Sequence, residues 1–139
     1  MLYFYWRIIL GGIIWLASYP KSGNTWLRIF IENLFRNTIE PAKINDLGVV
    51  KHNDNSPDLF RKIIGHNIDN MTDTELHQYR GNVQNYLAHG NESTFVKTHS
   101  ALQYHEGLPL IYLEHTAGAV YVLRNPFDMV ISFSDHFKI

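Results

Sequence analysis

The feature that most constrains the fold is an apolar run followed by a loop of small residues that carries a lysine. Residues 13–17 (IIWLA) predict a buried strand, and residues 21–24 (KSGN) form a loop soon after it. Apolar residues recur with helical spacing over residues 25–36, which predicts a helix. In such a strand–loop–helix unit, the backbone N–H groups of the loop and the positive end of the helix dipole converge on one point. Lys21 adds a full positive charge there, so the sequence predicts a site for a phosphate or sulfate ester.

Composition favours one globular domain in which any anion site is local. The chain has 139 residues, of which 45% are hydrophobic and 18% charged, as in a folded domain with a buried core. Its formal net charge of −1 argues against a nucleic-acid partner, because such binders are usually basic. The chain has no cysteine, which excludes disulfides, thiolate nucleophiles and cysteine zinc sites and slightly favours a cytoplasmic location. Its eight histidines show no HxxxH or HExxH spacing, so we expect no metal site.

The first residues are interpreted as an atypical apolar leader at residues 1–12. This segment is interrupted by Arg7, Gly11 and Gly12, so we expect no integral membrane span. A signal peptide would be cleaved near Ala17, which would remove the strand before the loop. The sequence leaves open whether the leader is an edge segment, a membrane-surface contact or an effect of gene-start assignment.

The middle of the chain predicts mostly surface structure. Residues 41–70 are polar and rich in turn formers, and they predict a surface excursion with one short helix at residues 56–64. Thr72 and Glu75 form a capping-box pattern, which predicts the start of a helix that continues through Leu87.

Strand and helix patterns alternate along the chain. Residues 94–98 and 119–123 predict two further strands, and residues 127–137 predict the last helix. Alternation of this kind is typical of an α/β fold with a parallel sheet. We therefore expect a P-loop-like, three-layer fold with a central parallel sheet.

Positively charged and imidazole side chains lie at the carboxyl ends of the predicted strands. Lys21 follows the first strand, Lys97 and His99 lie at the end of the second, and Arg124 follows the third. In open α/β sheets, ligands bind in the crevice beyond the carboxyl ends of the strands. One such charge alone is typical of a solvated surface, whereas four equivalent positions predict a site for a multiply anionic ligand.

Three short segments, residues 19–26 (YPKSGNTW), 97–99 (KTH) and 124–132 (RNPFDMVIS), occur in this order along the chain. Together they resemble the sulfotransferase family that uses 3′-phosphoadenosine 5′-phosphosulfate (PAPS). The first resembles the phosphosulfate loop of that family, with Asn24 where the common form has threonine. The second is similar to the segment that carries the family's catalytic base. The third resembles its 3′-phosphate motif, in which a serine follows the arginine by eight residues.

The resemblance implies that the loop holds the sulfuryl donor. Lys21 would stabilise the negative charge that grows on the bridging oxygen as the phosphate leaves. Gly23 tolerates positive φ and would let the backbone approach the donor closely. Trp26 would stack on the adenine, although a core aromatic of the helix remains an alternative. The other residues that the resemblance assigns to the 5′-phosphosulfate are Ser22, Asn24 and Thr25.

The resemblance also implies an enzyme, with transfer chemistry beside the loop. His99 would be the general base that takes the proton of the acceptor, since imidazole titrates near neutrality. Lys97 would stabilise the oxygens of the transferring sulfuryl group. Arg124 and Ser132 would hold the 3′-phosphate. The implied reaction moves a sulfuryl group in line from PAPS to a hydroxyl or amine acceptor and requires no metal.

The resemblance implies a longer domain than this sequence shows. The family's later portion closes the cofactor pocket with an Arg-x-Gly-x-x-Gly-Asp type of segment, which is absent here. We therefore expect residues 13–139 to be a truncated, N-terminal part of a sulfotransferase domain, with exposed apolar surface and either an oligomer or a missing C-terminal half. The acceptor would be a small molecule or a glycan or lipid hydroxyl, and activity of the chain by itself stays open. Two alternatives also stay open: a non-catalytic nucleotide-binding fragment and, disfavoured because the chain has no GxxxxGK[ST], a P-loop kinase-like phosphotransferase.

Overall fold

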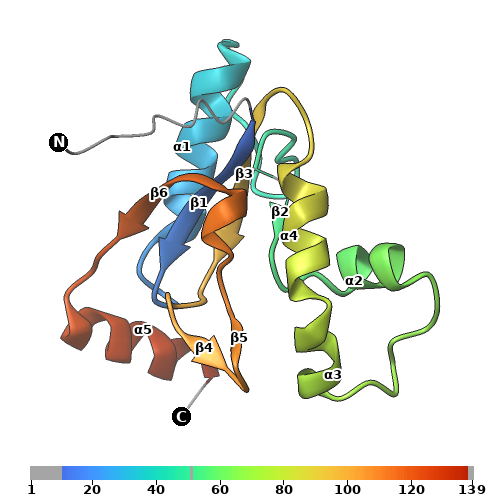
Figure 1. The fold of residues 1–139 in the computed structure, drawn as a ribbon. Coiled ribbons are helices and arrows are strands. Elements are labelled where there is room, and N and C mark those ends of the chain that lie inside the picture. Colours follow the sequence, from blue (N-terminus) through green and yellow to red (C-terminus); the bar gives the residue numbers. More distant parts are fainter. Residues whose placement is uncertain (1–10, 51, 138–139) are drawn as a thin grey trace, which may run out of the picture.

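A computed structural model of the protein describes residues 11–50 and 52–137. The predicted leader therefore lies outside the described residues, apart from Gly11 and Gly12. Within the described part of the chain, a four-stranded parallel sheet has the strand order β2-β3-β1-β6 (Figure 1). Its strands are β1 (Gly12–Ser18), β2 (His52–Asn53), β3 (Ser93–Thr98) and β6 (Thr116–Val122). The predicted α/β fold with a central parallel sheet is confirmed.

The described residues also form helices and a small antiparallel hairpin around the sheet. The helices are α1 (Asn24–Arg36), α2 (Pro57–Ile64), α3 (Asp73–Gln78), α4 (Arg80–Ala88), α5 (Pro126–Phe137) and the 3₁₀ helix η1 (Leu113–His115). The hairpin pairs β4 (Tyr104–His105) with β5 (Leu108–Pro109). Helices α1, α2 and α5 begin within one residue of the predicted positions. β2, η1 and the hairpin strands were not predicted, because segments of two or three residues show no measurable periodicity.

β1 lies between β3 and β6, and this position explains its apolar sequence. A strand with parallel neighbours on both sides and helices on both faces is largely buried, and all of β1 except the half-buried Ile14 and Ala17 is buried. β1 includes Gly12, which the sequence assigns to the leader. In the parallel register, Ala17 of β1 aligns with Thr98 of β3 and Tyr121 of β6. The carboxyl ends of these three strands therefore meet at one edge of the sheet.

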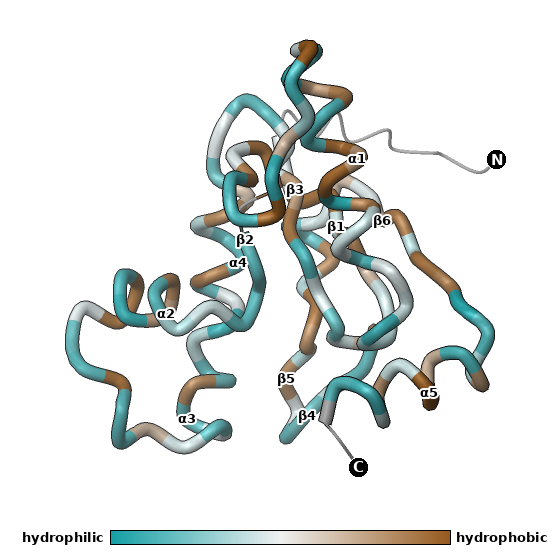
Figure 2. Tube along the Cα trace, turned by 180° about the vertical axis from the view of Figure 1, so that it is seen from behind, coloured by the Kyte–Doolittle hydropathy of each residue, from teal (hydrophilic) through white to brown (hydrophobic). Residues whose placement is uncertain are grey.

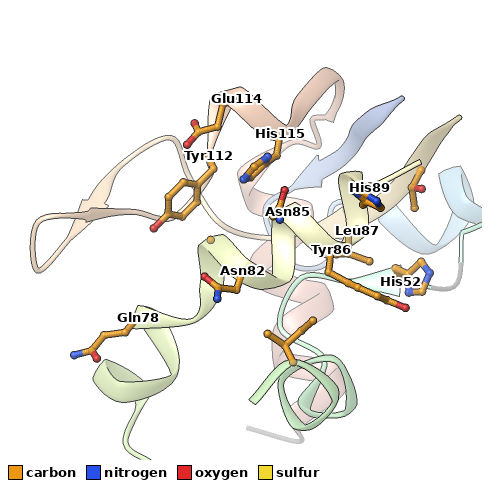
Figure 3. Close-up of a pocket in the computed structure, with 13 residues that line it drawn as sticks. His52, Gln78, Asn82, Asn85, Tyr86, Leu87, His89, Tyr112, Glu114 and His115 are labelled. Carbon is orange, nitrogen blue, oxygen red and sulfur yellow. The ribbon is translucent and has the colours of Figure 1, made fainter. Parts of the chain in front are cut away.

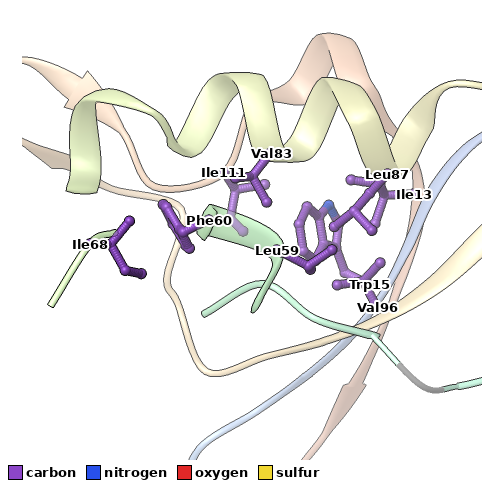
Figure 4. Close-up of a cluster of buried hydrophobic side chains, with 9 residues drawn as sticks. All are labelled: Ile13, Trp15, Leu59, Phe60, Ile68, Val83, Leu87, Val96 and Ile111. Carbon is purple, nitrogen blue, oxygen red and sulfur yellow. The ribbon is translucent and has the colours of Figure 1, made fainter. Parts of the chain in front are cut away.

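Side chains of β1 alternate between two apolar clusters, one on each face of the sheet. Ile13 and Trp15 pack in the larger cluster with residues of α2 and α4 (Figure 4). Leu16 packs on the opposite face with Ile31 of α1. Helices therefore cover both faces, which produces the three layers (Figure 1). The larger cluster comprises Ile13, Trp15, Leu59, Phe60, Ile68, Val83, Leu87, Val96 and Ile111.

The helix predicted to continue through Leu87 is divided into α3 and α4. Its start is confirmed, because the Thr72 hydroxyl accepts from the Glu75 N–H at 3.2 Å and the Thr72 N–H donates to Glu75 at 2.7 Å. The division falls at Tyr79, whose N–H bonds back to Leu76 at 3.0 Å in the tight pattern of a helix end. Position 79 holds a tyrosine, not the proline or glycine that usually signals a break in a helix. The periodicity of the sequence therefore predicts one continuous helix.

β6 is an edge strand of the sheet within the described ranges. It begins three residues before the predicted strand and ends before Leu123. Figure 2 shows hydrophobic residues along β6 and α5. The large apolar side chains exposed there are Val120, Tyr121, Leu123, Phe127, Val130 and Ile131.

No helix in the described residues has the length and apolar character needed to cross a membrane.

Candidate functional site

The loops after β1, β3 and β6 border one hollow of about 340 Å³ at the carboxyl edge of the sheet. This is the place where ligands bind in open α/β sheets. The hollow is lined by Pro20, Lys21, Gly23, Asn24, Thr25, Trp26, Lys97, His99, Arg124 and Ser132. The structure thus brings every predicted site residue except Ser22 to one hollow, although these residues come from three distant segments of the sequence.

The loop between β1 and α1 presents the amino end of the helix to the hollow. Gly23 occupies the position before α1 with φ 104°, as its predicted role requires. The first N–H groups of α1 have no intrahelical partner, as in any α-helix, and no side chain caps them at Gly23. Lys21 has φ 63°, a left-handed backbone conformation that is uncommon for residues other than glycine. Such strained positions cluster in ligand-binding loops, and no pattern in the sequence predicts this one.

Ser22 lies within the loop but does not line the hollow. Its hydroxyl donates to Sδ of Met129 on α5 at 3.0 Å, and its N–H donates to the Tyr19 carbonyl at 3.2 Å. The hydroxyl and the N–H of Ser22, which the resemblance assigns to the 5′-phosphosulfate, therefore both bond within the protein. Ser22 shapes the loop and ties it to α5.

Asn24 connects the start of α1 to the end of β1. Its side-chain Nδ2 donates to the Leu16 carbonyl at 2.7 Å and to Ser18 Oγ at 3.1 Å. These contacts use both N–H donors of the Asn24 side-chain amide. The group of Asn24 that remains for a ligand in the hollow is its backbone N–H, as at other helix starts.

His99 is oriented by a backbone carbonyl of β1. Its Nδ1 lies 2.7 Å from the Ser18 carbonyl oxygen and 3.3 Å from Ser18 Oγ. Because a carbonyl oxygen only accepts, Nδ1 carries the proton and Nε2 presents a lone pair. This is the tautomer that a general base needs. Ser18 was not predicted as a site residue, since a serine at a strand end has many ordinary roles.

Lys97 lies half-buried in a positively charged part of the site. Burial lowers the pKa of Lys97, the nearby charge of Arg28 lowers it further, and Asp54 partly opposes both effects. Burial also lowers the pKa of Arg28, whose guanidinium donates to the Val50 carbonyl at 2.8 Å and 3.3 Å. Two crowded cations at one end of the sheet favour an anionic ligand, which would relieve their repulsion. Arg28 was not predicted, because one arginine in an amphipathic helix resembles a surface charge.

Arg124 contacts the loop directly. Its Nη1 donates to the Lys21 carbonyl at 3.1 Å, and the rest of its guanidinium is exposed. Asn125 then starts α5, because its side chain accepts from the Phe127 N–H at 3.0 Å in the manner of a helix cap. This tight turn from strand to helix places Arg124 and Ser132 at the same hollow, which explains the eight-residue spacing of the motif.

A larger hollow of about 830 Å³ lies away from these loops. Figure 3 shows that its lining residues come from both sides of α4, with Tyr112 and His115 on one side and Tyr86 and His52 on the other. None of the predicted site residues lines it.

Within residues 11–50 and 52–137, no group of three or more acidic, histidine or cysteine side chains could hold a metal ion.

The fold is that of an α/β protein with a hollow at the carboxyl edge of its parallel sheet, where β1 leads into α1. The sequence matches the family model described as "Sulfotransferase domain" over residues 12–139. The chain therefore belongs to the sulfotransferase family, which supports a transferase role in sulfuryl transfer and a small-molecule acceptor. A comparison with curated proteins found no match.

Proposed function

We propose that the chain is a sulfotransferase that moves a sulfuryl group from PAPS to a hydroxyl or amine acceptor. The observation that carries this proposal is the single hollow shared by the loop at Lys21, the imidazole of His99 and the pair Arg124 and Ser132. PAPS has anionic groups at two positions, and the hollow is lined both by the loop at Lys21 and by Arg124 and Ser132.

The amino end of α1 and Lys21 would hold the 5′-phosphosulfate. Uncapped N–H groups and the helix dipole favour an anion there. Arg124 and Ser132 would hold the 3′-phosphate, and a guanidinium binds phosphate through several N–H groups at once. Trp26, which is 79% exposed at the rim of the hollow, would offer a flat surface to the adenine.

The transfer step would form a bond between sulfur and the acceptor oxygen or nitrogen and break the bond between sulfur and the bridging phosphate oxygen. His99 Nε2 would accept the proton of the acceptor, because Nδ1 is held by the Ser18 carbonyl. Lys21 would stabilise the charge on the leaving phosphate oxygen, and Lys97 the charge on the sulfuryl oxygens. Both lysines line the hollow together with His99.

The test combines binding with transfer. Calorimetry with adenosine 3′,5′-bisphosphate measures binding, and labelled PAPS with a panel of hydroxyl and amine acceptors measures transfer. His99→Ala should lower the transfer rate by about 100- to 10,000-fold while binding persists. His66→Ala serves as the matched control, since His66 is exposed and lies outside the hollow.

Each failure has a different meaning. Absence of bisphosphate binding by the wild-type chain would refute the proposal. Binding without transfer would favour a non-catalytic nucleotide-binding protein. Magnesium-dependent turnover of ATP would favour a kinase-like phosphotransferase.

A further inference from the structure

A buried carboxylate lies beneath the turn that carries His99. Asp54 follows β2 and is 1% exposed. Its Oδ2 accepts from Thr98 Oγ1 at 2.9 Å and from Ser100 Oγ at 3.1 Å, the two residues that flank His99. Its N–H donates to the Lys97 carbonyl at 3.2 Å. Asp54 therefore holds the chain on both sides of His99.

Arg80 completes this arrangement from the first residue of α4. Its Nη1 donates to Asp54 Oδ2 at 2.9 Å and lies 3.3 Å from Ser100 Oγ. Its Nη2 donates to Asn55 Oδ1 at 2.6 Å, and its side chain is only 12% exposed. Within the turn at residues 98–100, the Ser100 N–H also donates to Thr98 Oγ1 at 2.9 Å. The turn is thus fixed by charged groups from two other elements.

The pair formed by Asp54 and Arg80 is costly for stability alone. Removal of two charges from water offsets most of their mutual attraction, and well-packed apolar residues are often as stable. The pair also leaves Asp54 Oδ1 and Arg80 Nε buried without a partner among the described residues. An unsatisfied buried polar atom adds a further cost. A costly pair placed directly beneath His99 therefore points to a role in holding that residue.

We propose that Asp54 and Arg80 are positioning residues that fix the orientation of the His99 ring. The ring is held by Ser18 from β1 on one side, and its backbone is held by Asp54 on the other. Without Asp54, residues 98–100 relax, the bond from Nδ1 to the Ser18 carbonyl is lost, and the proton distributes between both ring nitrogens. The use of this orientation in sulfuryl transfer rests on the proposed function, whereas the orientation itself does not.

The direct test is the tautomer of His99, measured by ¹⁵N NMR of the imidazole nitrogens in the full chain and assigned with His99→Gln. The wild type should show a fixed Nδ1–H tautomer. Asp54→Asn should show a mixture of tautomers while the rest of the amide spectrum remains that of a folded protein. A fixed Nδ1–H tautomer in folded Asp54→Asn would overturn the proposal.

A milder variant keeps the test valid if Asp54→Asn does not fold. Ser100→Ala removes one hydroxyl that contacts both Asp54 and Arg80, and it should shift the tautomer ratio in the same direction. An unchanged ratio in Ser100→Ala would then overturn the proposal. Arg61→Gln is the matched control, because Arg61 forms exposed ion pairs with Asp58 and Asp69, both at 3.0 Å, and should leave the tautomer unchanged.

Binding and turnover separate this proposal from the proposed function. Asp54→Asn should bind adenosine 3′,5′-bisphosphate as the wild type does and lower kcat roughly 10- to 100-fold with little change in the KM for the donor. A parallel loss of binding would show a general structural defect and count against a positioning role. If the wild type binds no bisphosphate, the proposed function fails. The tautomer measurement still tests whether Asp54 fixes the orientation of the His99 ring.

Discussion

Substitution of Arg124 gives a direct test of the 3′-phosphate assignment, because this side chain has two separable contacts. Nη1 donates to the Lys21 carbonyl at 3.1 Å, and the exposed Arg124 side chain also lines the hollow. Arg124→Ala removes both the loop contact and the proposed phosphate contact. A comparison of two ligands can separate them, since adenosine 5′-monophosphate lacks the 3′-phosphate and adenosine 3′,5′-bisphosphate carries it.

The magnitude follows from the kind of contact. A hydrogen bond to a charged group contributes about 1.5–3 kcal/mol, which corresponds to roughly 10- to 150-fold in affinity. The bond to the Lys21 carbonyl has a neutral acceptor, so its loss should cost about 1 kcal/mol through the loop, equally for both ligands. Arg124→Ala should therefore weaken the bisphosphate by roughly 10- to 150-fold more than it weakens the monophosphate.

Calorimetric titration of wild type and Arg124→Ala with both ligands forms a double-mutant cycle, measured at one fixed salt concentration because surface charges are screened. Arg61→Ala is the control for general loss of a positive charge, since Arg61 lies on α2 outside the hollow. Equal weakening of both ligands by Arg124→Ala would refute the assignment and show that Arg124 acts only through the loop.

Three further outcomes follow from the same structure. Gly23→Ala should lower the free energy of unfolding in urea by about 1–2 kcal/mol, because a side chain at φ 104° is strained even though its Cβ would meet only Val122 at 4.0 Å; an unchanged midpoint would contradict this. Burial raises the pKa of Glu32, but hydrogen bonds from Arg36 and from the Gly48, Val49 and Val50 backbone outweigh it and hold the pKa below its ordinary value. The carboxylate of Glu32 therefore stabilises the fold above the unfolded pKa of about 4.3 and loses this effect as the pH falls through the lower folded pKa. Glu32→Gln should cost about 1–3 kcal/mol at neutral pH, and a difference from wild type that persists unchanged in acid would exclude this account. A bound anion should raise the lowered pKa of Lys97, so binding at alkaline pH below 10.5 should take up a proton, seen as a dependence of the calorimetric heat on buffer ionisation. Lys97→Met should abolish this uptake, and its persistence would assign the proton to another group.

The parts of the fold that the sequence predicted have local causes. The strand–loop–helix unit at residues 13–36 combines an apolar run, a glycine and a helical period, all within 24 positions in a row. The capping box at Thr72 likewise needs only the residue three positions later. Placement of Lys21, Lys97, His99 and Arg124 at one hollow required only that parallel strands end at the same edge.

The side-chain roles within the loop stay predictions, because the same residue can serve the ligand or the protein. Ser22 and Asn24 carry donors at positions suited to a phosphate group, and a sequence pattern cannot show that those donors are already bonded. In the structure, the Ser22 hydroxyl donates to Met129 Sδ, and the Asn24 side-chain amide donates to the Leu16 carbonyl. In the proposed anion site, backbone N–H groups and the charge of Lys21 would therefore contribute more than these two side chains.

The residues that orient the site differ in kind from those that would carry its chemistry. A base or a phosphate ligand must reach the hollow, so it lies at a strand end, and strand ends can be found in a sequence. An orienting group must instead match a partner brought near by tertiary structure: Ser18 bonds His99 across 81 positions, and Asp54 bonds Thr98 across 44. Asp54 stands in a turn-forming stretch (HNDNSP), where an aspartate is expected for local reasons. Its burial therefore becomes informative only when β2 and β3 are seen side by side, and the same holds for Arg80 at the start of α4.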